Sequence, residues 1–148
     1  MQGDFGQDRK NIAYLIKAFT EVFKNKLKQP ALILKTQRVG RSIMDQESIL
    51  KSIDDVRKET KGSLPKIYLL HGEVSDKEMN QLYNHPKIKA MVSFTKGEGF
   101  GRPLLEFSLT GKPIISSGWS GQVDFLDKDR ALLIGGSLSN VHKSAVMK

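Results

Sequence analysis

Short apolar runs alternate along the chain with segments of helical periodicity, and this alternation restricts the possible folds more than any other feature of the sequence. The runs that we expect to form strands lie at residues 31–34, 67–70, 88–94, 114–115 and 131–134. The first run follows Pro30 and is unbroken, as is typical of a strand buried on both faces. Strands that alternate with helices at this pace are joined by right-handed crossovers. The sequence therefore predicts an α/β fold, a parallel sheet with helices on both faces.

The first two helices are predicted from apolar residues at helical spacing. The first has Asp8 as its expected cap, and its apolar face is Ile12, Leu15, Ile16, Phe19 and Phe23. The second is expected to bury Ile49, Leu50, Ile53 and Val56 and to stop at Gly62.

Three further helices are marked by their end signals. Ser75 with Glu78 three residues later has the spacing of a capping box, and Met79, Leu82 and Tyr83 supply the inner face of that helix. A helix is expected from Pro103 to Thr110, with proline in its first turn and Gly111 as its stop. Residues 121–126 predict a short helix. Ligands of parallel sheets bind at the carboxyl ends of strands, so the loops after Leu34, Leu70, Phe94 and Ser116 are expected to surround the site.

Composition limits the class of protein. A chain of 148 residues with 39% hydrophobic content fits one globular domain, residues 1–148. No stretch approaches a membrane span or has the pattern of a secretory signal, so a cytoplasmic location is expected. The absence of cysteine excludes disulfides, thiolate nucleophiles and cysteine-ligated metals. His71, His85 and His142 show no ligand spacing, so no metal site is expected.

The net charge of +8 calls for an anionic partner. Nucleic acid, an anionic membrane surface and a nucleotide diphosphate all remain open on charge alone. The lysines are scattered, and few aromatic residues are interleaved with them, which argues against a nucleic-acid-binding surface.

Glycine is concentrated in residues 97–122, which do not fit three familiar loops. A dinucleotide fingerprint would need glycine where Arg102 stands, and a Walker loop would need serine or threonine in place of Pro113. A nucleophile elbow centred on Ser120 would need glycine in place of Gln122. The segment therefore belongs to none of these three classes.

The segment instead predicts a bend that could bind a ligand. Gly97, Gly99 and Gly101 allow close approach of a ligand to the backbone, and the helix that begins at Pro103 favours an anion such as a diphosphate at its tip. Two carboxylates, Glu98 and Glu106, flank the same point. Carboxylates repel phosphate, so their expected partners are sugar and ribose hydroxyls. A nucleotide-diphospho-sugar supplies both kinds of hydroxyl around its diphosphate.

The run from Glu98 to Glu106, followed by residues 111–115 (GKPII), resembles the paired-glutamate motif of retaining glycosyltransferases with the GT-B fold, of the group 1, family 4-like kind. Residues 9–19 and 74–83 resemble the first and third helices of the C-terminal domain in that family. The likeness extends from about residue 3 to residue 126. It implies that the chain is a Rossmann-like, donor-binding C-terminal half of a GT-B enzyme. The N-terminal acceptor domain and the final C-terminal elements are expected to lie outside the chain.

The resemblance also implies a role for particular residues. The implied catalytic residues are Glu98 and Lys10. The implied donor-binding residues are Arg9, Gly99, Phe100, Gly101, Pro103, Leu104, Glu106, Gly72, Val74 and Lys35. Within this set, Glu98 and the amides of residues 99–101 hold the transferred sugar, and Glu106 accepts hydrogen bonds from the ribose. Lys10 with Arg9 contacts the diphosphate. The backbone around residues 72–74 faces the base. Family members commonly have an arginine directly after a glycine, some six residues before the position of Lys10. In this sequence the glycine is Gly3, and Asp4 stands in place of the arginine.

The expected reaction is transfer of a hexosyl group from a nucleotide-diphospho-sugar to an acceptor sugar, lipid or protein, with retention and without a cofactor or metal. The isolated chain is expected to bind the donor weakly and to have little or no activity. Three alternatives remain open at this point: a non-catalytic nucleotide-sugar-binding module, a nucleotide-sugar epimerase of related fold, and a basic nucleic-acid-binding domain.

Overall fold

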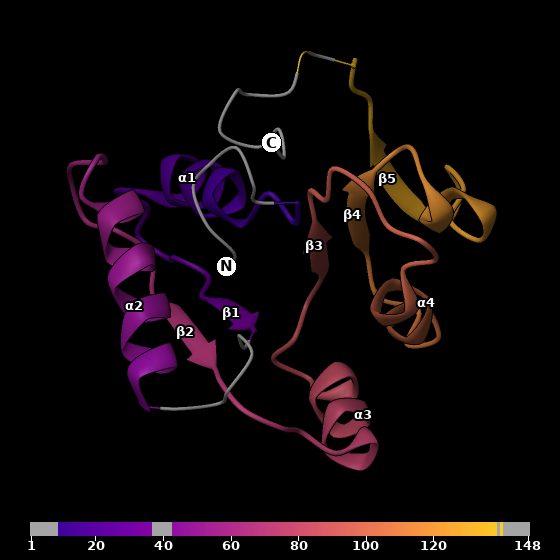
Figure 1. Cartoon of the computed structure of the whole chain (residues 1–148), viewed down its shortest axis with the longest axis horizontal. Coiled ribbons are helices and arrows are strands. Elements are labelled where there is room, and N and C mark those ends of the chain that lie inside the picture. Colours follow the sequence, from indigo (N-terminus) through magenta and orange to yellow (C-terminus); the bar gives the residue numbers. More distant parts are fainter. Residues whose placement is uncertain (1–8, 37–42, 139, 141–148) are drawn as a thin grey trace, which may run out of the picture. The chain divides into compact units, whose positions relative to one another are not determined.

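The computed structural model describes residues 9–36, 43–138 and 140. The chain divides into two compact units, Met1–Glu73 and Val74–Lys148, and each is described by itself. In Figure 1 the first unit runs from indigo to magenta and the second from rose to yellow.

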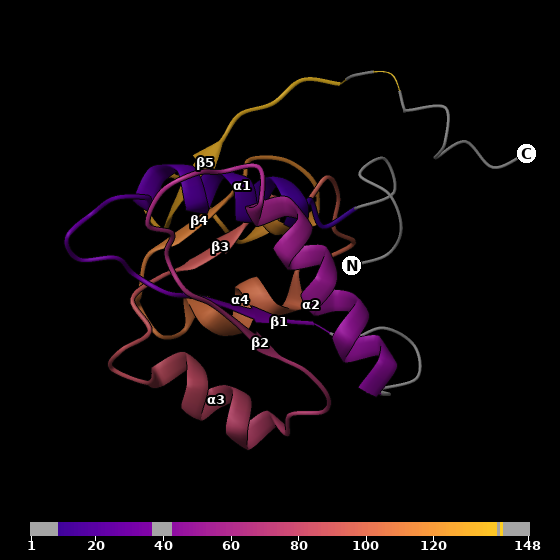
Figure 2. The same cartoon turned by 90° about the vertical axis from the view of Figure 1, so that its left-hand side faces the viewer.

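The first unit contains two helices and a two-stranded parallel sheet. The elements are α1 (Ile12–Phe23), β1 (Leu32–Lys35), α2 (Ile43–Arg57) and β2 (Ile67–Leu70). The strands pair in register with Ile33 opposite Tyr68, and α2 lies beside them in both views (Figures 1 and 2). The apolar core of this unit is formed by Ala13, Leu15, Ile16, Leu34, Ile49, Ile53 and Val56.

Helix α1 occupies the predicted segment but has a different cap. Its N-cap is Asn11, which has φ 54° in the left-handed region and makes no capping hydrogen bond through its side chain. Asparagine tolerates this conformation better than most residues, so the chain can turn directly into the helix. The prediction of Asp8 as the cap is therefore wrong, and Asp8 itself lies outside the described residues.

Two expectations of burial in the first unit are also wrong. The residues of β1 are not buried on both faces, because Leu34 is buried whereas Ile33 is 39% exposed. In α2 the buried stripe runs through Ile49, Ile53 and Val56, and Leu50 is exposed because it lies about 100° around the helix from Ile49. The helix ends at Arg57, before the predicted stop at Gly62.

The second unit contains a three-stranded parallel sheet in the order β3-β4-β5. Its elements are α3 (Asp76–Asn84), β3 (Met91–Ser93), α4 (Arg102–Ser108), β4 (Ile114–Ser117), the 3₁₀ helix η1 (Gly121–Asp124) and β5 (Ala131–Ile134). The register places Val92 opposite Ile115, and Ile115 opposite Leu132. Strand β3 is shorter than predicted because Ile88 belongs to a turn, in which its amide donates to the carbonyl of His85 over 2.9 Å.

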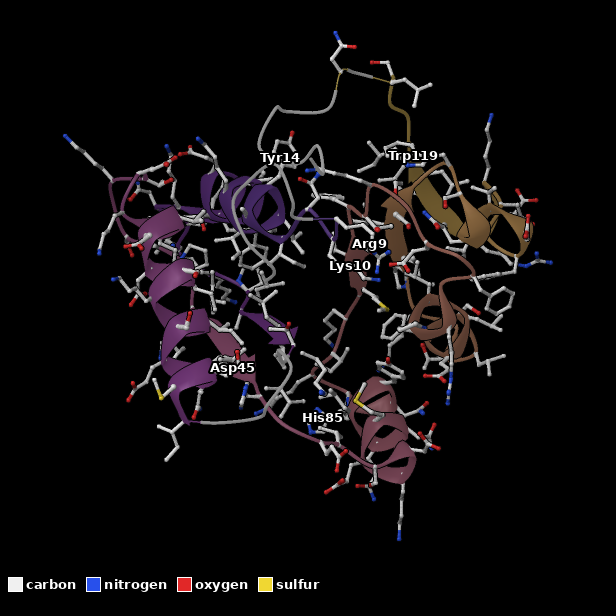
Figure 3. All side chains as sticks on the ribbon, in the orientation of Figure 1. Arg9, Lys10, Tyr14, Asp45, His85 and Trp119 are labelled. Atoms are coloured by element: carbon white, nitrogen blue, oxygen red, sulfur yellow. The ribbon has the colours of Figure 1, made fainter. Side chains whose placement is uncertain are left out.

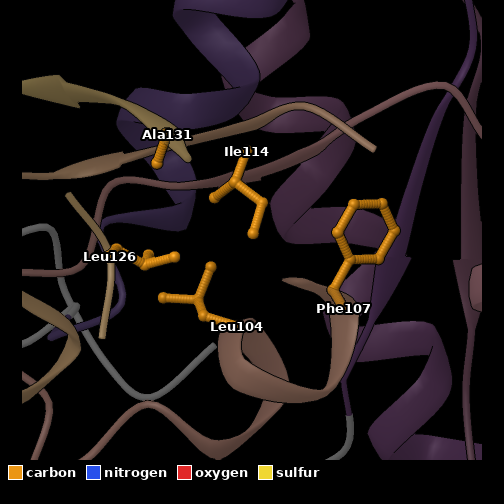
Figure 4. Packing of buried hydrophobic residues seen from close by; sticks show 5 residues of the cluster. All are labelled: Leu104, Phe107, Ile114, Leu126 and Ala131. Carbon is orange, nitrogen blue, oxygen red and sulfur yellow. The ribbon is translucent and has the colours of Figure 1, made fainter. Parts of the chain in front are cut away.

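The core of the second unit joins α4 to β4 and β5. Leu104, Phe107, Ile114, Leu126 and Ala131 are buried against one another (Figure 4). The ring of Tyr83 on α3 meets the ring of Phe107 edge-on at 5.4 Å between centroids, so α3 is attached to the same core.

Helix α3 begins as predicted. The hydroxyl of Ser75 accepts from the amide of Glu78, and a carboxylate oxygen of Glu78 accepts from the amide of Ser75 over 2.8 Å, which is a complete capping box. Met79, Leu82 and Tyr83 are half-buried, as expected of its inner face. At its other end the ammonium of Lys112 donates to the carbonyls of Tyr83 and His85.

The predicted class is confirmed: the described residues form a Rossmann-like α/β fold with parallel strands and four α-helices. Two features of the strands were not predicted. Their ladders fall into two parallel sheets, and each sheet belongs to one unit.

Candidate functional site

The loop after β3 is held by the loop after β4. The amide of Glu98 donates to Ser120 Oγ over 2.9 Å, and the same hydroxyl donates to the carbonyl of Glu98 over 2.6 Å. The amide of Gly121 adds a third bond, to the carbonyl of Glu98, over 3.1 Å. Both loops follow carboxyl ends of adjacent parallel strands, so they lie at the edge of the sheet where ligands of such folds bind. The backbone of Glu98 is therefore fixed in the loop that follows β3.

Two glycines are required by this geometry. A side chain on Gly121 would place its Cβ 2.2 Å from the carbonyl oxygen of Gly99, a distance that no real contact allows. Gly101 has φ 87°, which favours glycine, and it forms the N-cap of α4. By contrast, a Cβ on Gly99 would meet nothing within 4 Å. Gly99 is thus open on the side where a side chain would project, whereas its carbonyl packs against Gly121.

A buried polar network lies next to this loop. The amide nitrogen of the Gln122 side chain donates to the carbonyl and to the hydroxyl of Ser117, both over 3.1 Å. The Ser117 hydroxyl donates to the carbonyl of Thr95 over 2.8 Å, and the Thr95 hydroxyl donates to the carbonyl of Gly97 over 3.0 Å. Thr95, Ser117 and Gln122 are each at most 2% exposed. Since buried polar groups are costly unless hydrogen-bonded, the network stabilises one arrangement of the loop.

Glu106 is the second predicted glutamate, and it is half-buried on α4. Its Oε1 accepts from Arg102 Nε over 2.6 Å, and this contact, together with its negative charge, raises the pKa of Arg102. Burial, followed by the nearby charge of Glu106, raises the pKa of Tyr83. The carboxylate therefore lies where its charge is felt by both neighbours, one turn along the helix from Arg102.

The other predicted residues of the second unit have mixed surroundings. The ring of Phe100 is about half exposed and packs on Phe125 at 5.3 Å between centroids. Pro103 is exposed in the first turn of α4, while the side chain of Leu104 is 3% exposed and belongs to the core. Val74 is half-buried at the start of the unit. Helix α4 begins one residue earlier than predicted, at Arg102, and ends at Ser108.

The remaining predicted residues belong to the first unit. Arg9 and Lys10 are exposed neighbours directly before α1 (Figure 3). The ammonium of Lys35, at the carboxyl end of β1, donates to the carbonyl of Gly72 over 2.7 Å. Gly72 has φ 94°, and a Cβ there would meet nothing within 4 Å. The structure thus brings Lys35 and Gly72 together. Gly3 and Asp4 lie outside the described residues.

Sequence reasoning missed a buried pair in the first unit. His71 Nε2 lies 2.8 Å from Asp45 Oδ2, and both side chains are at most 10% exposed. The residues are 26 positions apart, so no local spacing could have signalled the contact. Among residues 9–36, 43–138 and 140, no group of three histidine, aspartate or glutamate side chains could hold a metal ion.

A family model for group 1 glycosyl transferases matches residues 1–142. The chain belongs to the group 1 glycosyltransferases. No curated protein matches it significantly. The sequence-based recognition of a GT-B-like glycosyltransferase domain is thereby confirmed, and the family implies a sugar donor and an acceptor as substrates. Within the described part of this glycosyltransferase, no helix is long and apolar enough to cross a membrane.

Proposed function

We propose that this glycosyltransferase domain is the donor-binding half of an enzyme that transfers a hexosyl group from a nucleotide-diphospho-sugar, with retention of configuration. The acceptor would be bound by a separate domain. Family membership supports glycosyl transfer in general. The arrangement of the site supports a nucleotide-diphospho-sugar as the donor.

The observation that carries the proposal is the open space on the side-chain side of Gly99, next to Glu98. The absence of a side chain at Gly99 allows a ligand to approach the loop, and three hydrogen bonds fix the backbone of Glu98, which carries the neighbouring carboxylate. Because a carboxylate accepts hydrogen bonds from hydroxyls, Glu98 with the amides of residues 99–101 would hold the sugar that is transferred. Glu106, half-buried one turn into α4, would accept from the ribose.

The cations of the first unit would serve the diphosphate. Lys10 and Arg9 are exposed and adjacent, as a site for a dianionic leaving group requires. The backbone at Gly72 and Val74 would face the base, and Lys35 would support it through its bond to the Gly72 carbonyl.

The chemical step needs charge stabilisation. The bond between the anomeric carbon and the diphosphate oxygen breaks, and its electron pair remains on the diphosphate. The acceptor oxygen forms the new bond on the same face of the sugar, and its proton passes to the departing diphosphate oxygen. Lys10 and Arg9 would lower the barrier by stabilising the charge that develops on the diphosphate. Losing one preorganised donor of this kind costs about 3 kcal/mol.

A thermal-shift screen tests the proposal. The probes are UDP, GDP and ADP, each with and without an attached hexose, and ligand binding raises the melting temperature according to its saturation. We expect at least one nucleotide and its sugar conjugate to stabilise the protein. If no probe does so while single-stranded RNA binds with a steep salt dependence, the chain is a nucleic-acid-binding domain and the proposal is wrong.

A further inference from the structure

Ser120 has a backbone conformation that is nearly restricted to glycine. Its φ is 71° and its ψ is −171°. A side chain at Cβ is strained in this region, whereas a glycine would adopt it freely. A serine at this position is therefore expected to contribute something through its side chain that offsets the strain.

The contribution of the side chain is visible in its contacts. The Ser120 hydroxyl accepts from the amide of Glu98 and donates to the carbonyl of Glu98, so one side chain satisfies both backbone groups of a single residue 22 positions away. Glu98 lies beyond the end of β3 at Ser93, in the loop that follows this strand. The two bonds of the serine therefore attach the loop after β3 to the loop after β4.

The segment that carries Ser120 is itself anchored. The amide of Gly118 donates to the carbonyl of Ile134 on β5 over 2.8 Å, and the indole of Trp119 donates to the carbonyl of Lys96 over 3.2 Å. On the other side of Ser120, Gln122 is fixed to Ser117 in the buried network. The hydroxyl is therefore held at a defined place relative to the sheet, and Glu98 is held with it.

We propose that Ser120 is a positioning residue that orients Glu98 toward the sugar of the donor. This inference rests on the proposed function. It implies that Ser120 contributes to the binding of a nucleotide-diphospho-sugar and not to the binding of the nucleoside diphosphate alone, because Glu98 would contact only the sugar.

The test compares Ser120→Gly, Ser120→Ala and the control Asn25→Gly. Ser120→Gly removes the hydroxyl and also the strain, whereas Ser120→Ala removes the hydroxyl and keeps the strain. Asn25 in the first unit is another non-glycine residue with positive φ, 58°, and its side chain accepts from the amide of Ser63 over 2.9 Å. It controls for the loss of a loop hydrogen bond together with relief of strain.

Two measurements are made on each variant. Hydrogen exchange of the Glu98 amide is followed by NMR without ligand. Calorimetry then gives the affinities for UDP and UDP-glucose, or for GDP and GDP-mannose if the guanine nucleotide binds the parent protein. In Ser120→Gly we expect exchange at Glu98 to accelerate about tenfold and the nucleotide sugar to bind up to about tenfold more weakly, with the diphosphate unchanged. Its melting temperature should stay above that of Ser120→Ala.

The outcomes distinguish the positioning role of Ser120 from the assignment of a nucleotide-sugar donor. Unchanged exchange at Glu98 in Ser120→Gly would overturn the positioning role whether or not a nucleotide binds. Equal weakening of diphosphate and nucleotide sugar would overturn it as well, because a general loss of structure affects both ligands. If the parent protein binds no nucleotide while exchange at Glu98 accelerates, the donor assignment fails and Ser120 still holds Glu98. Asn25→Gly should alter neither the exchange nor the ratio of affinities.

Discussion

Arg102 Nε lies 2.6 Å from Glu106 Oε1, one turn apart on α4, so the second glutamate of the motif already has a charged partner on its own helix. The guanidinium is largely exposed and also comes within 3.9 Å of Asp76. Exposed pairs of this spacing contribute little to stability, because water and salt screen them. Arg102 can therefore leave Glu106 when a hydroxyl takes its place.

The two ends of this ion pair should respond differently to substitution. Glu106→Ala should weaken the binding of a nucleoside diphosphate by about tenfold, since the ribose loses a charged acceptor. Arg102→Ala should leave that affinity unchanged or slightly higher, because the carboxylate no longer has to exchange partners. Calorimetry with the best nucleotide of the screen measures both. An equal loss in the two variants would mean that the pair acts only as part of the helix surface.

Gly99→Ala should separate binding from stability. A methyl group at this position meets no protein atom within 4 Å, so the melting temperature should be nearly unchanged. If a ligand approaches the amides of the loop, however, the methyl group occupies its space, and affinity for the nucleotide sugar should fall at least several-fold. Gly135→Ala, at another open glycine after β5, is the matched control and should alter neither quantity. Full affinity in Gly99→Ala would argue against a ligand over this loop.

Phe107→Ala should be the most damaging change in the second unit. The ring is 1% exposed and packs in the core with Leu104 and Ile114 and edge-on against Tyr83. Truncation of a buried phenylalanine costs about 3–5 kcal/mol, so chemical denaturation should show a large loss in the free energy of unfolding. Leu109→Ala, at an 83% exposed position after the same helix, should change little. Similar effects of the two variants would contradict the assigned core.

The capping box gives a defined dependence of stability on pH. Hydrogen bonds from the side chain and backbone of Ser75 hold the pKa of Glu78 below its ordinary value. A carboxyl with a lowered pKa in the folded state stabilises the fold fully above its unfolded pKa of about 4.3 and loses that contribution as the pH falls through the folded value. The difference in unfolding free energy between the parent protein and Glu78→Gln should therefore be present at pH 7 and shrink in acid. Lys77→Gln on the same helix leaves the bonds between Ser75 and Glu78 in place and should show no comparable trend.

The predictable parts of the fold are those with local signals. Strands β2 and β5 begin and end where their apolar runs do, and α3 begins where the Ser75 and Glu78 spacing predicts, because a capping box is complete within four residues. The N-cap of α1 was missed because Asn11 caps without a side-chain bond. The exposure of Leu50 depends on which stripe of α2 faces its neighbours, and tertiary packing decides this.

The candidate site likewise has features that local sequence signals predict and contacts that they do not. The glycines of the loop and the proline of α4 could be read as a bend that leads into a helix, and the structure has this bend. The spacing of Arg102 and Glu106 could also have predicted their ion pair. Two other contacts could not have been predicted: the hydrogen bonds of Ser120 with Glu98, and the contact of His71 with Asp45. Strand pairing and helix packing bring these residues together although they are more than 20 positions apart.

Trp119, labelled in Figure 3, is the single tryptophan of the chain. Its indole donates to the carbonyl of Lys96, directly before the glycine loop. It is partly exposed, so its emission depends on both solvent and this contact. The protein therefore carries an intrinsic fluorophore beside the proposed donor loop, and stopped-flow fluorescence can test for ligand binding there without any label.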